Sequence, residues 1–419
     1  NSYKSESTPK YHARETALEV AKLYGASVVL GSATPSLEAY YRAGKGEYRM
    51  FQLTRRLTGG ELPTVYTVDL RQELQEGNRS IFSRKLQELM ADRLNKGQQT
   101  ILFLNRRGYA GFVSCRSCGE VMKCPHCDVS LSEHKGGRLI CHYCGYTQPM
   151  PKLCPKCGSK YILGFKAGTQ QIEEKLKELY PGVRTLRMDA DTTRTKDSYE
   201  KILSSFANGE ADVLIGTQMI VKGHDFPKVT LVGILAADLS LNASDYRAGE
   251  RTFQLLTQAV GRAGRGGLPG EAVIQTYQPD HYAITCAAAQ DYESFYQEEI
   301  LYRELSGYPP VAHMLAVQIY GKEEENVKQL ALRLTDVVKS NMDFLSGKQK
   351  EQSNKKIQVL GPAPANISKI NDIYRYVFYV KHAEYDVLVE VKDRLEETLR
   401  QWQPRQMSIQ FDFDPVSVL

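Results

Sequence analysis

The stretch ILFLNRRGYAGFVSCRSC, residues 101–118, connects a short apolar segment to a closely spaced pair of cysteines. Residues 100–104 have the composition of a buried strand, and further strand-like segments follow after the cysteine-rich region. Helical segments alternate with these strands, which predicts a parallel sheet with crossover helices, interrupted by the cysteine-rich region. The expected strands are 100–104, 183–188, 213–215, 230–235 and 272–276, and the expected helices are 83–95, 170–179 and 251–260.

Eight of the nine cysteines form four C-x-x-C pairs. The two-residue spacing lets both thiolates of a pair face one metal ion, and a glycine after three of the pairs favours the tight turn that this requires. Four pairs supply two tetrahedral four-thiolate sites, so we predict two structural Zn²⁺ ions. A disulfide framework is disfavoured because nothing marks the chain as secreted, and a redox pair because the copies are tandem. The pairs are Cys115/Cys118, Cys124/Cys127, Cys141/Cys144 and Cys154/Cys157, and the glycines are Gly119, Gly145 and Gly158.

The pairing of the cysteines stays open on spacing alone, because adjacent and nested arrangements both allow tetrahedral geometry. Residues 129–140 read as a short hairpin around Gly136 and Gly137, which would bring Cys127 close to Cys141. The hairpin therefore favours a nested arrangement, in which the outer two pairs bind one ion and the inner two pairs bind the other.

The two ends of the chain differ from the central sheet. A helix is expected over residues 15–24, and the β-branched run 27–30 predicts a short strand that leads into a turn at 31–36. From residue 299 the pattern changes to long strands and two helices, which predicts a separate α+β domain. The chain begins Asn1-Ser2 without an initiator methionine or a leader, and we interpret it as a fragment.

The composition of the chain argues against a membrane protein but does not decide between other classes of protein. The net charge of +5 permits nucleic acid as a partner without requiring it. No stretch approaches the roughly 18 apolar residues that a membrane helix needs, so we expect no membrane partner and a cytoplasmic location. The segment QAVGRAGR at 258–265 is typical of a nucleic-acid motor, yet the chain contains neither G-x-x-x-x-G-K-[ST] nor an acidic box for Mg²⁺.

Five segments together resemble motifs III to VI of superfamily 2 helicases. They are GSATPS (31–36), ILFLNRRGYAGFVSC (101–115), DADTTR (189–194), IGTQMIVKGHDFPKVTLVGIL (215–235) and QAVGRAGR. Their order around a double zinc insert resembles one family, the primosomal replication-restart helicases of the PriA type, along the whole chain. This resemblance implies an α/β fold with a RecA-like helicase lobe, an inserted zinc domain with two four-cysteine sites, a remnant of the first helicase lobe and a C-terminal α+β domain. The implied boundaries are 1–68 for the remnant, 69–110 and 161–298 for the second lobe, 111–160 for the zinc insert and 299–419 for the C-terminal DNA-binding domain.

The function that the resemblance implies is that of an ATP-dependent 3′-to-5′ DNA helicase of replication restart, which binds stalled forks and promotes primosome assembly. The P-loop and an Asp-Glu-Glu-His box would lie upstream of Asn1, so ATP and Mg²⁺ would bind the intact protein, while this chain alone would bind DNA and zinc without hydrolysing ATP. Implied partners are forked and single-stranded DNA, single-stranded-DNA-binding protein and primosome loading proteins. The alternatives are a non-enzymatic zinc-dependent DNA or protein interaction module and another superfamily 2 translocase, such as an RNA helicase.

The motif VI resemblance assigns catalysis to three residues. Arg265 would be the arginine finger, because a planar and permanently charged guanidinium suits charge that develops on a transferred phosphate. Arg262 and Gln258 would lie on the same helix face and support it. Ser32 and Thr34 of the GSATPS segment would couple the state of the nucleotide to the grip on DNA.

The motif V resemblance assigns further residues to a loop that leaves the end of a strand. Gly223 and Asp225 would communicate with the nucleotide, and Thr217, Gln218 and Lys222 would contact the DNA backbone, which positions a strand without reading its sequence. The neighbouring histidine of this loop, His224, is interpreted as a structural hydrogen-bond donor and not as a general base.

Aromatic residues near cations predict two more DNA contacts. Tyr11 and Arg14 belong to YKSESTPKYHAR at 3–14, which resembles the aromatic-rich loop of this family and could stack on bases. In the C-terminal domain, Tyr374 and Arg375 likewise place an aromatic residue next to a cation, and we expect them to contact DNA. Alternation along a strand would place Tyr374 and Tyr376 on one face and Arg375 on the other.

Overall fold

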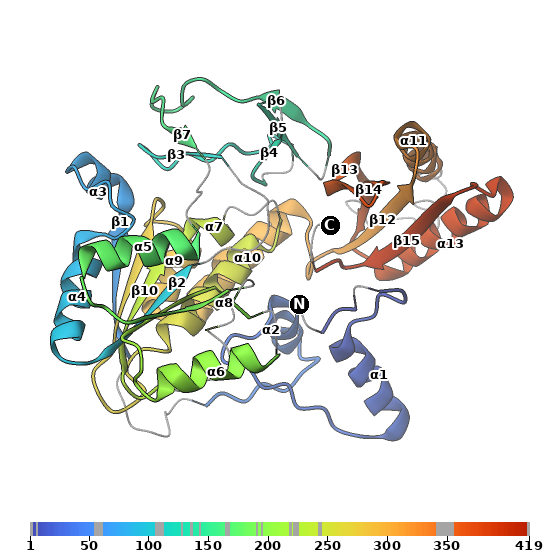
Figure 1. The fold of residues 1–419 in the computed structure, drawn as a ribbon. Helices are drawn as coiled ribbons and strands as arrows, with labels where there is room; N and C mark the ends of the chain where they lie inside the picture. The colour runs from blue at the N-terminus through green and yellow to red at the C-terminus, as the bar shows by residue number, and fades with distance from the viewer. Residues whose placement is uncertain are drawn as a thin grey trace.

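The structure is a computed structural model of the chain. It describes residues 3–5, 7–53, 62–104, 113–126, 129–134, 137–141, 144–163, 168–189, 192–193, 196–217, 220, 226–241, 245–340 and 356–416. Figure 1 shows the large sheet domain on the left, the C-terminal domain on the right, the zinc insert above them and the N-terminal segment below.

The large domain contains a six-stranded sheet in the order β1-β11-β10-β2-β9-β8, and all neighbouring strands are parallel. This confirms the predicted parallel sheet. The structure adds β1 at the edge, paired with β11 from Thr64 opposite Glu271 to Asp69 opposite Thr276. The predicted domain boundary after residue 68 therefore falls inside β1, a strand of half-buried residues that local hydrophobicity did not reveal. The strands are β1 (Thr64–Asp69), β2 (Gln99–Leu104), β8 (Thr185–Met188), β9 (Val213–Gly216), β10 (Val229–Leu235) and β11 (Glu271–Thr276).

Helices cover both faces of this sheet because alternate residues of a strand point to opposite sides. Leu102 and Leu104 of β2 pack with α4 and α5, whereas Ile101 and Phe103 pack with α6, α8, α9 and α10. Two separate cores result, which explains why the central strand β10 is buried along its whole length. The helices are α4 (Arg84–Asn95), α5 (Thr169–Leu179), α6 (Lys196–Ala207), α8 (Ala248–Val260), α9 (Tyr282–Ala289) and α10 (Tyr292–Ser306); the short α3 (Leu70–Gln75) and α7 (Asp238–Leu241) follow β1 and β10.

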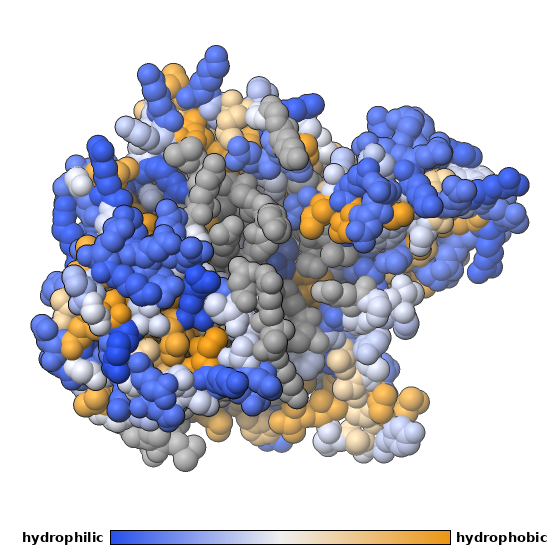
Figure 2. All heavy atoms as spheres, viewed as in Figure 1, coloured by the Kyte–Doolittle hydropathy of each residue, from blue (hydrophilic) through white to orange (hydrophobic). Residues whose placement is uncertain are grey.

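The N-terminal segment contains α1 (Ala13–Tyr24) and α2 (Leu37–Gly44). The strand predicted at 27–30 is wrong, since these residues form no regular element and Val29 is 92% exposed. A strand is stable only beside another strand, and the described residues place none next to this run. Leu23 is also 83% exposed, and hydrophobic residues gather at the surface around α1 in Figure 2.

The zinc insert consists of short antiparallel pairs. β4 (Ser132–His134) and β5 (Arg138–Ile140) form the hairpin predicted around residues 136 and 137, and β6 (Thr147–Pro149) extends it. β3 (Ser114–Cys115) pairs with β7 (Ile162–Leu163), which closes the insert at its base.

The C-terminal domain has an antiparallel sheet in the order β13-β14-β12-β15, and α11 and α13 pack on one of its faces. This arrangement confirms the predicted α+β class. The predicted boundary before residue 299 lies within α10, which runs unbroken from the large domain toward this one. No helix of the described ranges is long and apolar enough to cross a membrane. The elements are β12 (His313–Gly321), α11 (Glu324–Ser340), β13 (Gln358–Ile370), β14 (Ile373–His382), α13 (Tyr385–Trp402) and β15 (Met407–Phe413).

Candidate functional site

The GSATPS segment rests on α8, the helix that contains the start of QAVGRAGR. Gln258 donates from Nε2 to the Oγ1 of Thr34 at 3.4 Å, and Thr34 itself is buried. Gln254 donates from Nε2 to the carbonyl oxygen of Pro35, and the Oγ of Ser32 accepts from the backbone N–H of Thr34 at 3.1 Å. The structure therefore brings together residues that the sequence placed in two different motifs, 224 positions apart.

The prediction that Gln258, Arg262 and Arg265 share one helix face is wrong. α8 ends at Val260, and the arginines follow in a turn whose Gly264 has φ of +75°. Glycine readily adopts this left-handed conformation, so Gly264 turns the chain away from the helix direction beyond the right-handed C-cap residue Gly261. Arg265 is exposed and donates from Nε to the carbonyl oxygen of Gly261 at 2.8 Å.

The turn after α8 packs tightly against the residues that follow the motif V candidate. Gly264 donates its N–H to the carbonyl oxygen of Val229 at 3.0 Å. A Cβ atom on Gly266 would lie 2.2 Å from the carbonyl oxygen of Pro227, so only glycine fits there. Thr217 is placed directly after β9, where the sequence predicted it. The predicted residues Gln218, Lys222, Gly223, His224 and Asp225 lie outside the described residues.

The predicted aromatic loop forms a compact turn before α1. Lys4 and His12 form an antiparallel bridge, and the Tyr11 side chain is 54% exposed. Arg14 is not directed at solvent, because it donates from Nη1 to the Oγ of Ser36 at 2.6 Å and from Nε to Glu15. Arg14 thus holds the loop against the first residues of α2, whereas Tyr11 is available to a ligand.

A buried ionic cluster lies under α8, and no sequence signal predicted it. Arg303 contacts Glu299 at 2.6 Å and Glu250 at 3.3 Å, while Arg247 contacts Glu38 at 2.6 Å. Burial would raise the pKa of the Glu38 carboxyl, but Arg247 and Arg303 lower that pKa to about 2. The cluster joins α2, α8 and α10 through charges that are far apart in the sequence.

The cysteines gather in two groups. The four Sγ atoms of Cys115, Cys118, Cys154 and Cys157 lie within 4.8 Å of one another, with 3.6 Å from Cys115 to Cys157 and from Cys118 to Cys154. Four sulfurs around Zn²⁺ at about 2.3 Å would be about 3.8 Å apart, whereas a disulfide needs about 2.05 Å. The observed spacing fits a zinc site and excludes disulfides in this group.

The second group contains Cys124, Cys141 and Cys144, and Sγ of Cys124 lies 3.6 Å from Sγ of Cys144. The remaining predicted ligand, Cys127, lies outside the described residues. Among the described cysteines the outer pairs meet each other and the inner pairs meet each other, which is the nested arrangement. Four thiolates leave no open position for a water molecule, so such a zinc ion has a structural role.

The turns that hold these cysteines also attach the insert to both neighbouring domains. The φ of Gly119 is +78°, and a Cβ atom there would lie 2.5 Å from the carbonyl oxygen of Tyr277 at the end of β11. Arg116 lies over the Tyr277 ring at 4.8 Å. Gly145, with φ of +78°, packs against Ala363 of β13. The outer zinc site therefore contacts the large sheet domain, and the inner site contacts the C-terminal sheet.

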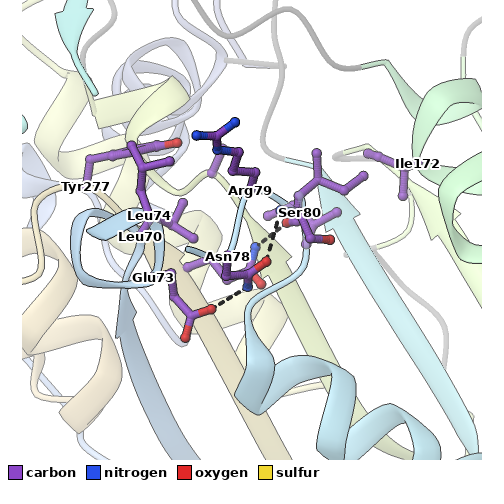
Figure 3. Close-up of a pocket in the computed structure, with 12 residues that line it drawn as sticks. Leu70, Glu73, Leu74, Asn78, Arg79, Ser80, Ile172 and Tyr277 are labelled. Carbon is purple, nitrogen blue, oxygen red and sulfur yellow. Dashed lines mark hydrogen bonds between the residues drawn. The ribbon is translucent and has the colours of Figure 1, made fainter. Parts of the chain in front are cut away.

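A cavity of about 130 Å³ opens at the carboxyl ends of β1, β10 and β11 (Figure 3). Its lining includes apolar residues such as Leu74 and Leu235, the Tyr277 ring and polar residues from the turn after α3. Asn78 of that turn donates from Nδ2 to the carbonyl oxygen of Phe82 and accepts from the N–H of Ser80. The cavity is somewhat smaller than the roughly 150 Å³ that accommodates a benzene ring.

The predicted DNA-contact residues of β14, Tyr374 and Arg375, lie on opposite faces of the sheet. Tyr376 is buried on the face covered by α11, where its hydroxyl donates to Glu324 at 3.3 Å. Arg375 lies over the Tyr320 ring at 5.7 Å on the other face. Tyr374 is half-buried beside Lys369, whose Nζ lies 4.8 Å from the ring centre.

Three family models match the chain. The C-terminal domain of primosomal protein N matches residues 304–416, the Cys-rich region of the PriA DNA helicase matches 124–149, and the helicase conserved C-terminal domain matches 153–267. The first covers the C-terminal sheet, the second the inner cysteines, and the third includes the turn after α8.

Curated relatives match along the whole chain. The replication restart protein PriA of Bacillus subtilis is 44% identical over 100% of this chain and 51% of its own length. The protein of the same name from Synechocystis is 41% identical over 98% of this chain and 49% of its own length, and that from Treponema pallidum is 36% identical over 100% and 61%. The chain thus spans about half the length of the first two relatives.

Proposed function

Because the chain belongs to the PriA family of replication restart proteins, we propose that it forms part of an ATP-dependent DNA helicase that moves 3′ to 5′ and acts at stalled forks in the cytoplasm. In a protein of the relatives' full length, the remaining residues would provide the phosphate loop and the carboxylates for Mg²⁺. This chain would provide the motif III to VI residues, two structural zinc ions and DNA contacts.

The contact between Thr34 and Gln258 carries the proposal. A motor must transmit the state of a nucleotide to the residues that hold DNA, and the GSATPS loop here lies directly on the helix that leads to Arg265. Gln254 and Tyr292 both donate to the carbonyl oxygen of Pro35, so the loop is fixed to two helices. A shift of α8 would therefore move the loop as well.

The roles of individual residues follow from their chemistry. Bound ATP with Mg²⁺ supplies the transferable phosphate. Arg265, exposed after the end of α8, would place its guanidinium on charge that develops during hydrolysis, with Arg262 and Gln258 beside it. Gly223 and Asp225 would communicate with the nucleotide, and Ser32 and Thr34 with the DNA grip.

We expect DNA to contact residues of the loop before α1, of the segment after β9 and of β14. Tyr11, with more than half of its surface exposed, offers a ring for base stacking, and Thr217 lies at a strand end with Gln218 and Lys222 near it in sequence. Tyr374 and Arg375 would contact the fork from the C-terminal sheet, and Arg14 would position Tyr11. Single-stranded-DNA-binding protein and primosome loading proteins are the protein partners that we propose.

Strand displacement tests the proposal. A protein of the relatives' full length that contains this chain should separate a DNA duplex with a 3′ single-stranded tail when ATP is present, and should leave a duplex with only a 5′ tail intact. Forked DNA should compete better than duplex RNA for binding, because a replication helicase and an RNA helicase differ in this preference. ATP-dependent unwinding of RNA alone would contradict the proposal.

A further inference from the structure

Two lysines of the loop before α1 converge on one carboxylate of the C-terminal domain. The Nζ of Lys4 lies 2.8 Å and the Nζ of Lys10 lies 3.9 Å from the Asp412 side chain in β15. The three side chains are 11%, 4% and 7% exposed. These groups join segments about 400 positions apart in the sequence, in an environment that water scarcely reaches.

Further bonds make this contact a clamp with a defined geometry. Lys4 donates from Nζ to the carbonyl oxygen of Phe413 at 2.7 Å, and Lys10 donates from Nζ to the Oε1 of Gln318 at 3.0 Å. The loop is closed by its own backbone, because Ser5 donates its N–H to the carbonyl oxygen of Tyr11 and Ala13 donates to that of Tyr3. The loop is therefore held as a unit against the sheet.

From the clamp, contacts lead to the predicted DNA residue of β14. The Oε1 of Gln318 accepts from the Tyr320 hydroxyl at 2.6 Å, and Arg375 lies over the Tyr320 ring. Tyr320 and Arg375 are directly opposite each other in the antiparallel register. All these side chains lie on the face of the sheet opposite α11 and α13, since their neighbours in sequence belong to the core under those helices.

In the other direction, contacts lead to the predicted nucleotide motifs. Arg14 follows the loop and donates from Nη1 to Ser36, whose Oγ also accepts from the first turn of α2. Two residues before Ser36, Thr34 accepts from Gln258. A series of contacts along the described residues therefore joins Arg375 on the C-terminal sheet to Gln258 at the end of α8, and the loop before α1, described at residues 3–5 and 7–12, lies in the middle.

We propose that Asp412 is a positioning residue through which the C-terminal sheet controls the loop, so that DNA held at Arg375 is reported to the contact between Thr34 and Gln258. The inference rests on the proposed function. Removing the Asp412 charge would remove the carboxylate that Lys4 and Lys10 share, and breaking a buried ion pair by removing one partner is strongly unfavourable. The loop would then leave the sheet, and DNA at the sheet would no longer affect ATP turnover.

The first measurement is hydrogen exchange in the 419-residue chain. In Asp412→Asn the amides of residues 3–14 should exchange at least tenfold faster than in the original chain, because the ion pairs of the clamp have been lost. Asp393→Asn is the matched control, since Asp393 is an exposed carboxylate of the same domain paired with Lys392. Unchanged exchange of residues 3–14 in Asp412→Asn would overturn the clamp.

The second measurement compares DNA binding with DNA-stimulated ATP turnover in a protein of full length. Asp412→Asn should bind forked DNA with a Kd within about twofold of the original protein, yet lose at least about fivefold of the stimulation, a usual size for coupling between sites. Asp412→Glu should restore part of the stimulation, and Asp393→Asn should not alter it. Lys10→Met removes one ammonium group of the same clamp and should show the same pattern if Asp412→Asn folds poorly.

The outcomes separate the two proposals. If the original protein shows stimulated turnover and both variants keep it, the clamp has no coupling role and the proposed function stands. If binding and stimulation fall together, Asp412 acts through DNA affinity, and the coupling inference is wrong. If the original protein shows no DNA-stimulated turnover, the proposed function fails and the coupling inference falls with it.

Discussion

Arg303 lies fully buried between Glu250 and Glu299, and Arg247 links the same cluster to Glu38 of α2. The cluster could not be predicted from the sequence, because it joins Glu38, Glu250 and Arg303 from three different helices. A charged residue on a helix is usually solvated. By contrast, the sequence did assign functional roles to Thr34 and Gln258, since both belong to short segments with recognisable motifs. The role of a single residue was thus predictable where the residue belongs to a recognisable local motif. It was not predictable where the role depends on which elements pack together.

Arg303→Ala should destabilise the chain by about 3–5 kcal/mol, because it leaves the buried Glu299 carboxylate without its counter-charge and removes one of the two arginines that pair with Glu250. Arg84→Ala is the control, since Arg84 and Glu76 form an ion pair with 50% and 63% of the side chains exposed, and exposed pairs contribute about 1 kcal/mol or less. Urea unfolding followed by circular dichroism measures both. Equal shifts of the two midpoints would show that the buried cluster contributes no more than a surface pair.

Elements were predicted best where the hydrophobic pattern is strong. The central strands and α4, α5 and α8 appear close to their expected positions because apolar residues recur there at the period of a strand or helix. The run 27–30 fails because a strand needs a neighbouring strand, and β1 was missed because its residues are only half-buried. The helix expected over 251–260 ends where α8 ends, at Val260, and only the assignment of Arg262 and Arg265 to its face was wrong.

The turns after the cysteine pairs offer a test at this scale. Gly119→Ala and Gly158→Ala both place alanine in a left-handed conformation, which costs about 1–2 kcal/mol, since the two φ angles are +78° and +70°. Only at Gly119 would the new Cβ also meet backbone, that of Tyr277, whereas nothing lies within 4 Å at Gly158. Overpacking adds about 1–3 kcal/mol, so Gly119→Ala should unfold at the lower temperature of the two.

Calorimetric unfolding of the two variants gives the comparison, and both should retain zinc because neither loses a thiolate. Equal transition temperatures would mean that the outer zinc turn is not pressed against β11 in solution.

On the scale of the whole molecule, the zinc insert connects the large sheet domain to the C-terminal sheet. Gly119 contacts the end of β11 and Gly145 contacts β13. One hydrophobic cluster contains cysteines of both groups together with Met314 and Tyr379 of the C-terminal sheet. The sequence predicted the insert and its position between strands, since C-x-x-C spacing is highly specific. The sequence could not predict that the insert contacts both domains, because the residues that make these contacts have no recognisable sequence pattern.

Purified protein should contain two zinc ions, and Cys115→Ser and Cys124→Ser should each lose about one, from different sites. Chelation should increase hydrogen exchange in the insert and in β13, because the binding free energy of structural zinc is folding free energy. The buried strand β10 serves as the internal control and should stay protected. One ion or none after gentle purification, or exchange of β10 together with the insert, would contradict this account.

The most direct test of the proposed motor is steady-state phosphate release with saturating forked DNA. In a protein of full length, Arg265→Ala should lose roughly 10³-fold or more in turnover while still binding nucleotide, and Arg265→Lys should not restore it, because a point charge lacks the planar guanidinium. Arg84→Ala should leave turnover unchanged, and the 419-residue chain alone should release no phosphate. Near-normal turnover by Arg265→Ala, or substantial turnover by the chain alone, would contradict the account.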